Sequence, residues 1–199
     1  NNNKFKVLDT KKILKMHLHY GEVIKGQFKK NETVNLIVDS KKRQRVKIYH
    51  SATHLLHASL RKILGANVTQ KGSLVSFDRL RFDFSYSKSI SDIDIKKIEN
   101  VANKIIKQNE KVNISIMAYK KAVEKGAMAL FGEKYEDEVR VVSMGKEENK
   151  PIFSMELCGG THVNKTSEIN DIKIIKQSSV ASGIRRVEAL SGNDLSNYI

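Results

Sequence analysis

Hydrophobic and polar positions divide the chain into a strand-like first part and a mixed remainder. Up to about residue 48, apolar and polar residues alternate in HLHYGEVIKG, QFKKNETVNLIVD and RQRVKIYH, with Gly26 and a polar turn around Asn31 between these stretches. A period of two is typical of strands, and short strands separated by turns are typical of a small barrel or a meander. We therefore expect a small β-barrel over residues 1–48.

From His50 the apolar spacing becomes helical, in HSATHLLHASLRKILG, with Gly65 as the stop signal. The stretch SISDIDIKKIENVANKIIKQNEK predicts an amphipathic helix with Ser91 as its N-cap, and AYKKAVEKG predicts a short helix. Strand patterns follow in the stretches GSLVSFDRLRFDFSYS, VNISIMAY, VRVVSMG, IFSMELC and DIKIIKQSSVASGIRRVEALSG. The expected class is α+β, with a mostly antiparallel sheet and helices on one face, in a second domain over residues 49–199.

Composition and charge narrow the possible partners. The 199 residues carry a formal net charge of +14, mostly from lysine, which favours contact with the phosphate backbone of a nucleic acid. The basic run SKKRQR at residues 40–45 is either a solvated loop or a phosphate contact. No apolar run is long enough to span a membrane and the start does not resemble a signal peptide, so we expect a cytoplasmic protein without a membrane partner. The single cysteine excludes an intrachain disulfide.

Two short motifs together predict a metal site. His50 and His54 lie on one face of the expected helix, and CGGTH later places Cys158 four residues before His162. Two imidazoles, a thiolate and a third imidazole form a tetrahedral set that zinc prefers. His57 shares the helix face, so spacing alone leaves open which two of the three histidines bind. The alternative is a buried free cysteine with surface histidines. The zinc-protease pattern HExxH is absent.

Four blocks of this sequence are similar to a known family. HSATHLLHASLRKILGANVTQKGSLVSFDRLRFDFS, FGEKYEDEVRVVSMG, FSMELCGGTHV and ASGIRRVEALSG resemble, in this order, the editing domain of alanyl-tRNA synthetases. The first strands resemble the small β-barrel that precedes this domain. The threonyl-tRNA synthetase editing domain is also similar, but its cysteine loop typically ends in Gly-Pro-His, where this chain has CGGTH.

The resemblance implies roles for individual residues. It implies one zinc ion per chain, held by His50, His54, Cys158 and His162, and it makes His57 a packing residue. Gln70, in a stretch that lines the editing pocket of the family, and Cys158 are the catalytic candidates. The candidates for contact with substrate or tRNA are Gly72, Ser73, Arg81, Gly183, Arg185 and Arg186. Arg81 and Asp83 could equally form a pair on a solvated face.

The function implied by the resemblance is hydrolysis of mischarged seryl- or glycyl-tRNA(Ala) at the tRNA acceptor end. Ligation of alanine, with ATP and magnesium, would need a core that is absent here, so we expect the chain to be part of a longer parent synthetase whose remainder is its partner. A freestanding trans-editing deacylase, a non-catalytic zinc-stabilised tRNA-binding module and a metal hydrolase for a small molecule are the alternatives.

Overall fold

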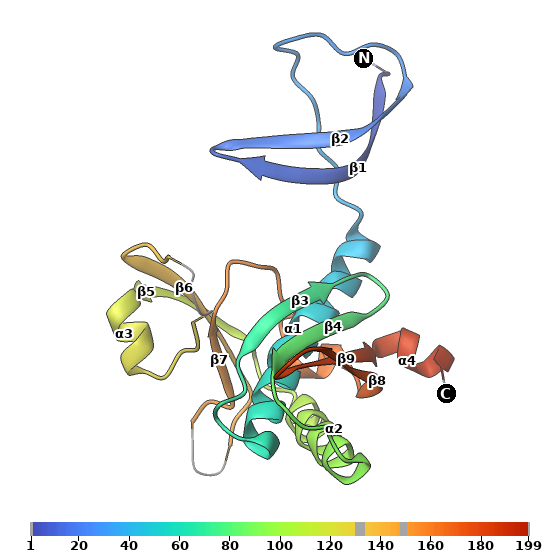
Figure 1. Ribbon diagram of the computed structural model, residues 1–199. Helices are drawn as coiled ribbons and strands as arrows, with labels where there is room; N and C mark the ends of the chain where they lie inside the picture. The colour runs from blue at the N-terminus through green and yellow to red at the C-terminus, as the bar shows by residue number, and fades with distance from the viewer. Residues whose placement is uncertain (1, 130–133, 148–150, 199) are drawn as a thin grey trace. The chain divides into compact units, whose positions relative to one another are not determined.

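The computed structural model describes residues 2–129, 134–147 and 151–198, and the chain divides into two compact units, Asn1–Val38 and Asp39–Ile199. The first unit contains an antiparallel hairpin of β1 (Lys4–Ile13) and β2 (Met16–Lys25), drawn in blue in Figure 1. The stretch QFKKNETVNLIVD, which was expected to add a strand, has none. Two strands do not test the expected barrel, which stays a prediction.

The second unit contains two antiparallel sheets. The larger has the order β3-β4-β9-β8, and the smaller has the order β5-β6-β7. The bounds are β3 Gln70–Val75, β4 Leu80–Ser85, β8 Ile172–Ala181 and β9 Ile184–Ser191, then β5 Asn113–Ala118, β6 Glu138–Met144 and β7 Ser154–Leu157. The helices are α1 Ser40–Leu64, α2 Asp92–Lys107, α3 Tyr119–Glu124, the 3-10 helix η1 Thr166–Ile169 and α4 Gly192–Tyr198. The predicted α+β class is confirmed.

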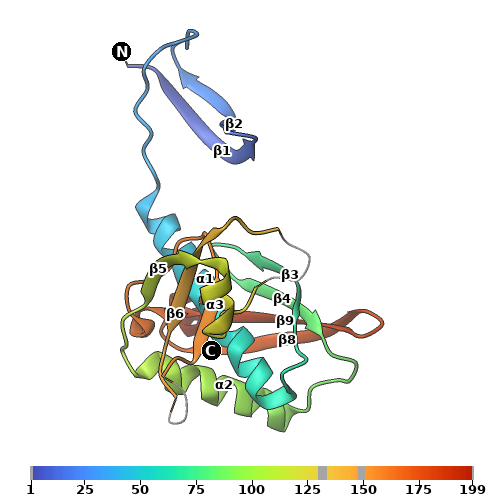
Figure 2. The same cartoon turned by 90° about the vertical axis from the view of Figure 1, so that its left-hand side faces the viewer.

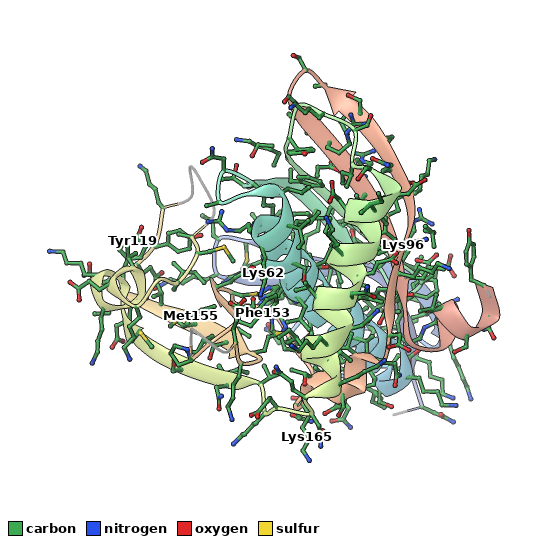
Figure 3. The ribbon with its side chains drawn as sticks, turned by 90° about the horizontal axis from the view of Figure 1, so that it is seen from below. Lys62, Lys96, Tyr119, Phe153, Met155 and Lys165 are labelled. Carbon is green, nitrogen blue, oxygen red and sulfur yellow. The ribbon has the colours of Figure 1, made fainter. Side chains whose placement is uncertain are left out.

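Helix α1 packs against elements of both sheets of this unit. It contacts α2, strands β3, β4 and β9 of the larger sheet and β7 of the smaller one (Figures 1 and 2). Figure 3 shows α1 and α2 side by side from below. Among the helices of the described residues, none is long and apolar enough to cross a membrane.

The beginning of α1 differs from the sequence prediction. RQRVKIYH, expected as a strand, lies inside the helix, which starts at Ser40 with Asp39 as N-cap. The Asp39 side chain accepts a hydrogen bond from the Lys42 N–H at 3.0 Å, and such a cap favours a helix where a short alternating pattern fits either structure. The expected domain boundary at 48/49 therefore falls within α1, and the two units divide between Val38 and Asp39.

The main core lies between α1, α2 and the larger sheet. Leu55, Leu56 and Leu60 of α1 are fully buried together with Phe82 and Phe84 of β4. The strand pattern predicted in GSLVSFDRLRFDFSYS is thus confirmed at β4, whose phenylalanines face the core. A second, smaller cluster joins α3 to the three-stranded sheet.

We expect Leu56→Ala to destabilise the second unit by about 2–5 kcal/mol, because a fully buried leucine leaves a cavity that its neighbours fill only in part. Urea unfolding followed by circular dichroism would measure the loss. Leu56→Met, which keeps the volume, should cost less than about 1.5 kcal/mol. Equal losses in the two variants would contradict this packing.

Candidate metal centre

Four side chains from two distant segments meet in the second unit. His50 and His54 lie one turn apart in α1, whereas Cys158 and His162 lie in the loop after β7. Their ligand atoms all lie within 4.8 Å of one another, and Cys158 Sγ is 3.4 Å from Nε2 of both His50 and His162. Tetrahedral bonds of about 2.3 Å to sulfur and about 2.0 Å to nitrogen would separate such atoms by about 3.5 Å. Spacing and donor types therefore fit a metal ion with the preferences of zinc.

Two of the imidazoles have partners on their outward nitrogens. His50 Nδ1 lies 3.2 Å from the Thr161 carbonyl oxygen, and His162 Nδ1 lies 3.1 Å from Ser51 Oγ. Partners of this kind commonly fix the tautomer and ring orientation of a metal-binding histidine. They leave Nε2 of both rings directed at Cys158.

A buried carboxylate, Glu156 of β7, faces the remaining histidines of α1. Its Oε2 lies 3.5 Å from Nδ1 of His54, and its Oε1 lies 3.1 Å from Nδ1 of His57. The His57 ring also packs against Phe82, with 5.0 Å between ring centroids. His54 belongs to the group of four and His57 lies outside it, which answers the question that the spacing left open.

Burial keeps the histidines of this group neutral. It lowers the pKa of His50 to about 4 and that of His162 to about 2, in both cases helped by the nearby His54. Burial also lowers the pKa of His54 and raises the pKa of the Cys158 thiol. Neutral imidazoles offer lone pairs to a cation, whereas the thiol has to release its proton when a metal binds.

The cysteine loop is held in place by Arg140 of β6. Its Nη1 donates hydrogen bonds to the carbonyl oxygens of Cys158 at 2.6 Å and Gly160 at 2.8 Å. A Cβ on Gly160 would lie 2.2 Å from the His50 ring, so glycine is needed for this close approach. His50 and Cys158 are half-buried whereas His54 and His162 are buried, so the side of the centre formed by His50 and Cys158 lies nearest to solvent.

The sequence is similar to that of known proteins, and the matched regions include the metal ligands. Residues 139–188, which include Cys158 and His162, match the family described as the threonyl and alanyl tRNA synthetase second additional domain. The chain is 52% identical over 188 residues to the alanine–tRNA ligase of Chelativorans sp. (strain BNC1), an alignment that covers 92% of the chain and 21% of that protein. The chain belongs to the alanyl-tRNA synthetase family.

A second relative covers the whole chain almost completely. The alanine–tRNA ligase of Parvibaculum lavamentivorans (strain DS-1 / DSM 13023 / NCIMB 13966) is 46% identical over 199 residues, which is 98% of the chain and 22% of that protein. The chain thus spans about a fifth of the length of these curated relatives.

In this member of the family, an ion pair joins two strands of the larger sheet. Arg186 of β9 donates from Nε and Nη2 to the two carboxylate oxygens of Asp83 at 2.6 and 2.7 Å, and the two residues are cross-strand neighbours. Arg81 Nε lies farther off, 3.8 Å from Asp83 Oδ1. Gly72 faces the same carboxylate, because a Cβ there would lie 3.4 Å from Asp83 Oδ2. The Arg186 guanidinium is therefore bound within the sheet, and contacts of Arg81 and Arg186 with RNA stay predictions.

Of the other residues singled out in the sequence, Gln70 and Ser73 lie on the edge strand β3, whereas Gly183 and Arg185 lie at the turn into the internal strand β9. Gln70 Nε2 lies 3.4 Å from Ser73 Oγ on β3, which packs against α1. Arg185 Nε donates to the Lys88 carbonyl oxygen at 3.2 Å, and Gly183 occupies the β8–β9 turn with a φ of 71°. The metal ligands lie on α1 and in the loop after β7, whereas these other candidates lie on the larger sheet. The candidate residues therefore form two separate groups.

The sequence reasoning missed three residues that support the metal centre: Ser51, Arg140 and Glu156. A signal existed for Glu156, since a carboxylate stands in an otherwise apolar strand pattern two residues before Cys158. Arg140 carries no such signal, because its contact with the cysteine loop depends on the pairing of β6 with β7.

We expect His54→Asn to weaken zinc binding by more than about 100-fold, and His57→Asn to leave the bound zinc near one per chain. Loss of a residue that only hydrogen-bonds to a metal ligand lowers metal affinity by about 10- to 100-fold, and loss of the ligand itself should lower it more. Asparagine keeps a donor near Glu156 in both variants but cannot replace Nε2. Competition with a chelating dye, with metal content determined on the same samples, measures the effect. Similar losses in both variants would exclude His54 as the specific ligand.

Proposed function

We propose that this domain hydrolyses the ester bond of tRNA(Ala) mischarged with serine or glycine. One observation supports the proposal above all: a chain of the alanyl-tRNA synthetase family carries a four-residue group that can hold a metal, and its His50 and Cys158 are accessible in part. A centre that served only to hold the fold together would need no open side.

The reaction breaks the bond between the acyl carbon of the amino acid and the ribose oxygen of the terminal nucleotide. A water oxygen adds to the carbonyl carbon, and the ribose oxygen leaves and takes a proton, so that free amino acid and tRNA result. A bound zinc ion would supply Lewis-acid polarisation and an anchoring point. In the proposal the side-chain amide of Gln70 orients the water, and Cys158, on the open side, would be the metal ligand nearest to the bound substrate.

Selection against alanine needs a polar group that only the wrong amino acid satisfies. Gln70 and Ser73 lie close together on β3, with amide and hydroxyl groups that could bond a serine hydroxyl. Alanine would leave such a group unpaired, at a cost of about 1–3 kcal/mol. That cost corresponds to about 5- to 150-fold in rate. Glycine lacks the hydroxyl, so we assign its hydrolysis to its small size.

The proposed partner is the acceptor end of tRNA(Ala), for which a net charge of +14 is suitable. We assign ligation of alanine, with ATP and magnesium, to the rest of a longer parent chain in the cytoplasm. The relatives that carry the ligase name are about five times as long as this chain.

We expect single-turnover assays to show fast release of serine from seryl-tRNA(Ala) and about 5- to 150-fold slower release of alanine from alanyl-tRNA(Ala). Treatment with a chelator should abolish the difference, and added zinc should restore it. A sample with about one zinc per chain that leaves both esters intact would refute the editing function for this chain.

We expect Gln70→Ala to slow serine release by about 10- to 100-fold, with zinc content unchanged, because loss of a water-orienting group affects the chemical step. Ser73→Ala is the neighbouring control. It should reduce the ratio of serine release to alanine release, and the rate of glycine release should change less. An unchanged rate in Gln70→Ala would show that this side chain does not place the water.

A further inference from the structure

A concentration of positive charge lies at the beginning of α1, away from the metal ligands. The cations of its first turns are Lys41, Lys42, Arg43, Arg45 and Lys47. Arg45 pairs with Asp194 at 2.5 Å. Among the residues that the structure describes, no carboxylate pairs with Lys41, Arg43 or Lys47. Cations so close together repel one another, and a bound polyanion would relieve that repulsion.

An exposed aromatic ring lies against these cations. Phe77, in the turn between β3 and β4, keeps 44% of its surface exposed. Lys42 Nζ lies 5.3 Å and the Arg45 guanidinium carbon lies 5.5 Å from the centre of its ring. The Tyr49 hydroxyl donates to the carbonyl oxygen of Asp78 at 2.9 Å, which ties this turn to α1. The ring is therefore held at a defined place beside the basic turns.

Cations beside an exposed aromatic ring are the combination that unpaired nucleic acid requires. Proteins that bind unpaired nucleic acid place cations along the phosphate backbone and aromatic rings under the bases. A basic helix without an aromatic side chain would suit any polyanion, and an exposed phenylalanine alone would need no explanation. Here the two occur together, and the arginine and lysine that lie over the ring would contact the phosphates next to a stacked base.

We propose that the Phe77 patch, defined as Lys41, Lys42, Arg43, Arg45 and Phe77, binds an unpaired stretch of RNA, with one base stacked on Phe77 and the backbone phosphates on the cations. The helical rise places Arg45 about 7.5 Å before His50 along α1, since each residue advances about 1.5 Å. An RNA whose 3′ end lies at the metal centre would have to cover this axial distance to place its last unpaired nucleotides on the patch. The identity of that RNA as tRNA(Ala) rests on the proposed function, whereas the binding chemistry does not.

The absence of tryptophan from the chain gives a direct test. Phe77→Trp introduces the chain's single tryptophan at the patch. Uncharged tRNA(Ala) should quench the tryptophan emission in a saturable way that weakens as salt is added. Emission that does not respond to RNA at concentrations where RNA binds would overturn stacking at this residue. Failure of the wild-type chain to bind either uncharged tRNA(Ala) or a single-stranded RNA oligonucleotide would overturn the inference entirely.

Substitutions then separate the patch from the overall charge. Phe77→Ala should weaken RNA binding by about tenfold, and Phe77→Trp should retain it. Lys41→Ala with Arg43→Ala should weaken binding and lower the slope of log affinity against log salt by about one to two. The matched control, Lys96→Ala with Lys120→Ala, lowers the formal net charge equally, from +14 to +12. Lys96 lies on α2 (Figure 3) and Lys120 on α3, and this pair should leave affinity nearly unchanged.

Equal losses of RNA affinity in the Lys41→Ala, Arg43→Ala double variant and in the Lys96→Ala, Lys120→Ala control would mean that only the overall charge matters. That result would overturn the inference. Poly-glutamate that binds as tightly as RNA, with the same dependence on Phe77, would overturn it in favour of an acidic protein partner. Since uncharged RNA is used, the result does not depend on hydrolysis. If editing occurs, Phe77→Ala should need about tenfold more protein to reach half the maximal single-turnover rate, while the maximal rate is unchanged.

Discussion

Helix α1 is buried on every side from Ser51 to Leu60, and this burial is the constraint on which the unit around it depends. A helix with apolar residues all round would meet that constraint simply. This one carries polar side chains in its buried stretch, and each needs a partner because an unpaired buried polar group is costly. The Thr53 and Ser59 hydroxyls return to carbonyl oxygens one turn earlier in the helix, at 2.8 and 2.7 Å. The remaining polar groups, Ser51, His54 and His57, have to be met from outside α1.

The elements packed against α1 supply partners for Ser51 and His57 and place Glu156 3.5 Å from Nδ1 of His54, and in doing so they build the metal centre. Ser51 contacts His162, which brings the cysteine loop onto the helix. Glu156 of β7 meets both His54 and His57, so the strand that leads into the loop is held by the same helix turn. A metal ion bound by the four ligands would join the loop to α1 and so add to the stability of the fold. Support of the fold and preparation of a reactive centre therefore come from the same contacts.

The character of α1 changes along its length. Its first turns are exposed and basic beside Phe77. Its middle carries the half-buried ligand His50 and the buried ligand His54, and its end packs on the main core. A straight helix keeps these regions at set distances, because its rise per residue is constant. A substrate that is negatively charged along its length and reactive at its end suits this order of regions along the helix.

The sequence by itself determined the helix capped by Ser91, the strands that follow it, and the candidates for metal ligands, which are Cys158, His162 and the histidines of α1. These follow from local rules: a capping serine, alternation with a period of two, and the ligand preferences of zinc. Local rules were insufficient at RQRVKIYH, where a short alternating stretch fits strand and helix alike and the cap at Asp39 selects the helix. Only the tertiary structure decided that His54 rather than His57 joins the group, that Arg140 and Glu156 support it, and that Phe77 lies against Lys42 and Arg45. Each of these depends on contacts between segments far apart in the chain, and their distances arise only when α1, β7 and the β3–β4 turn pack together.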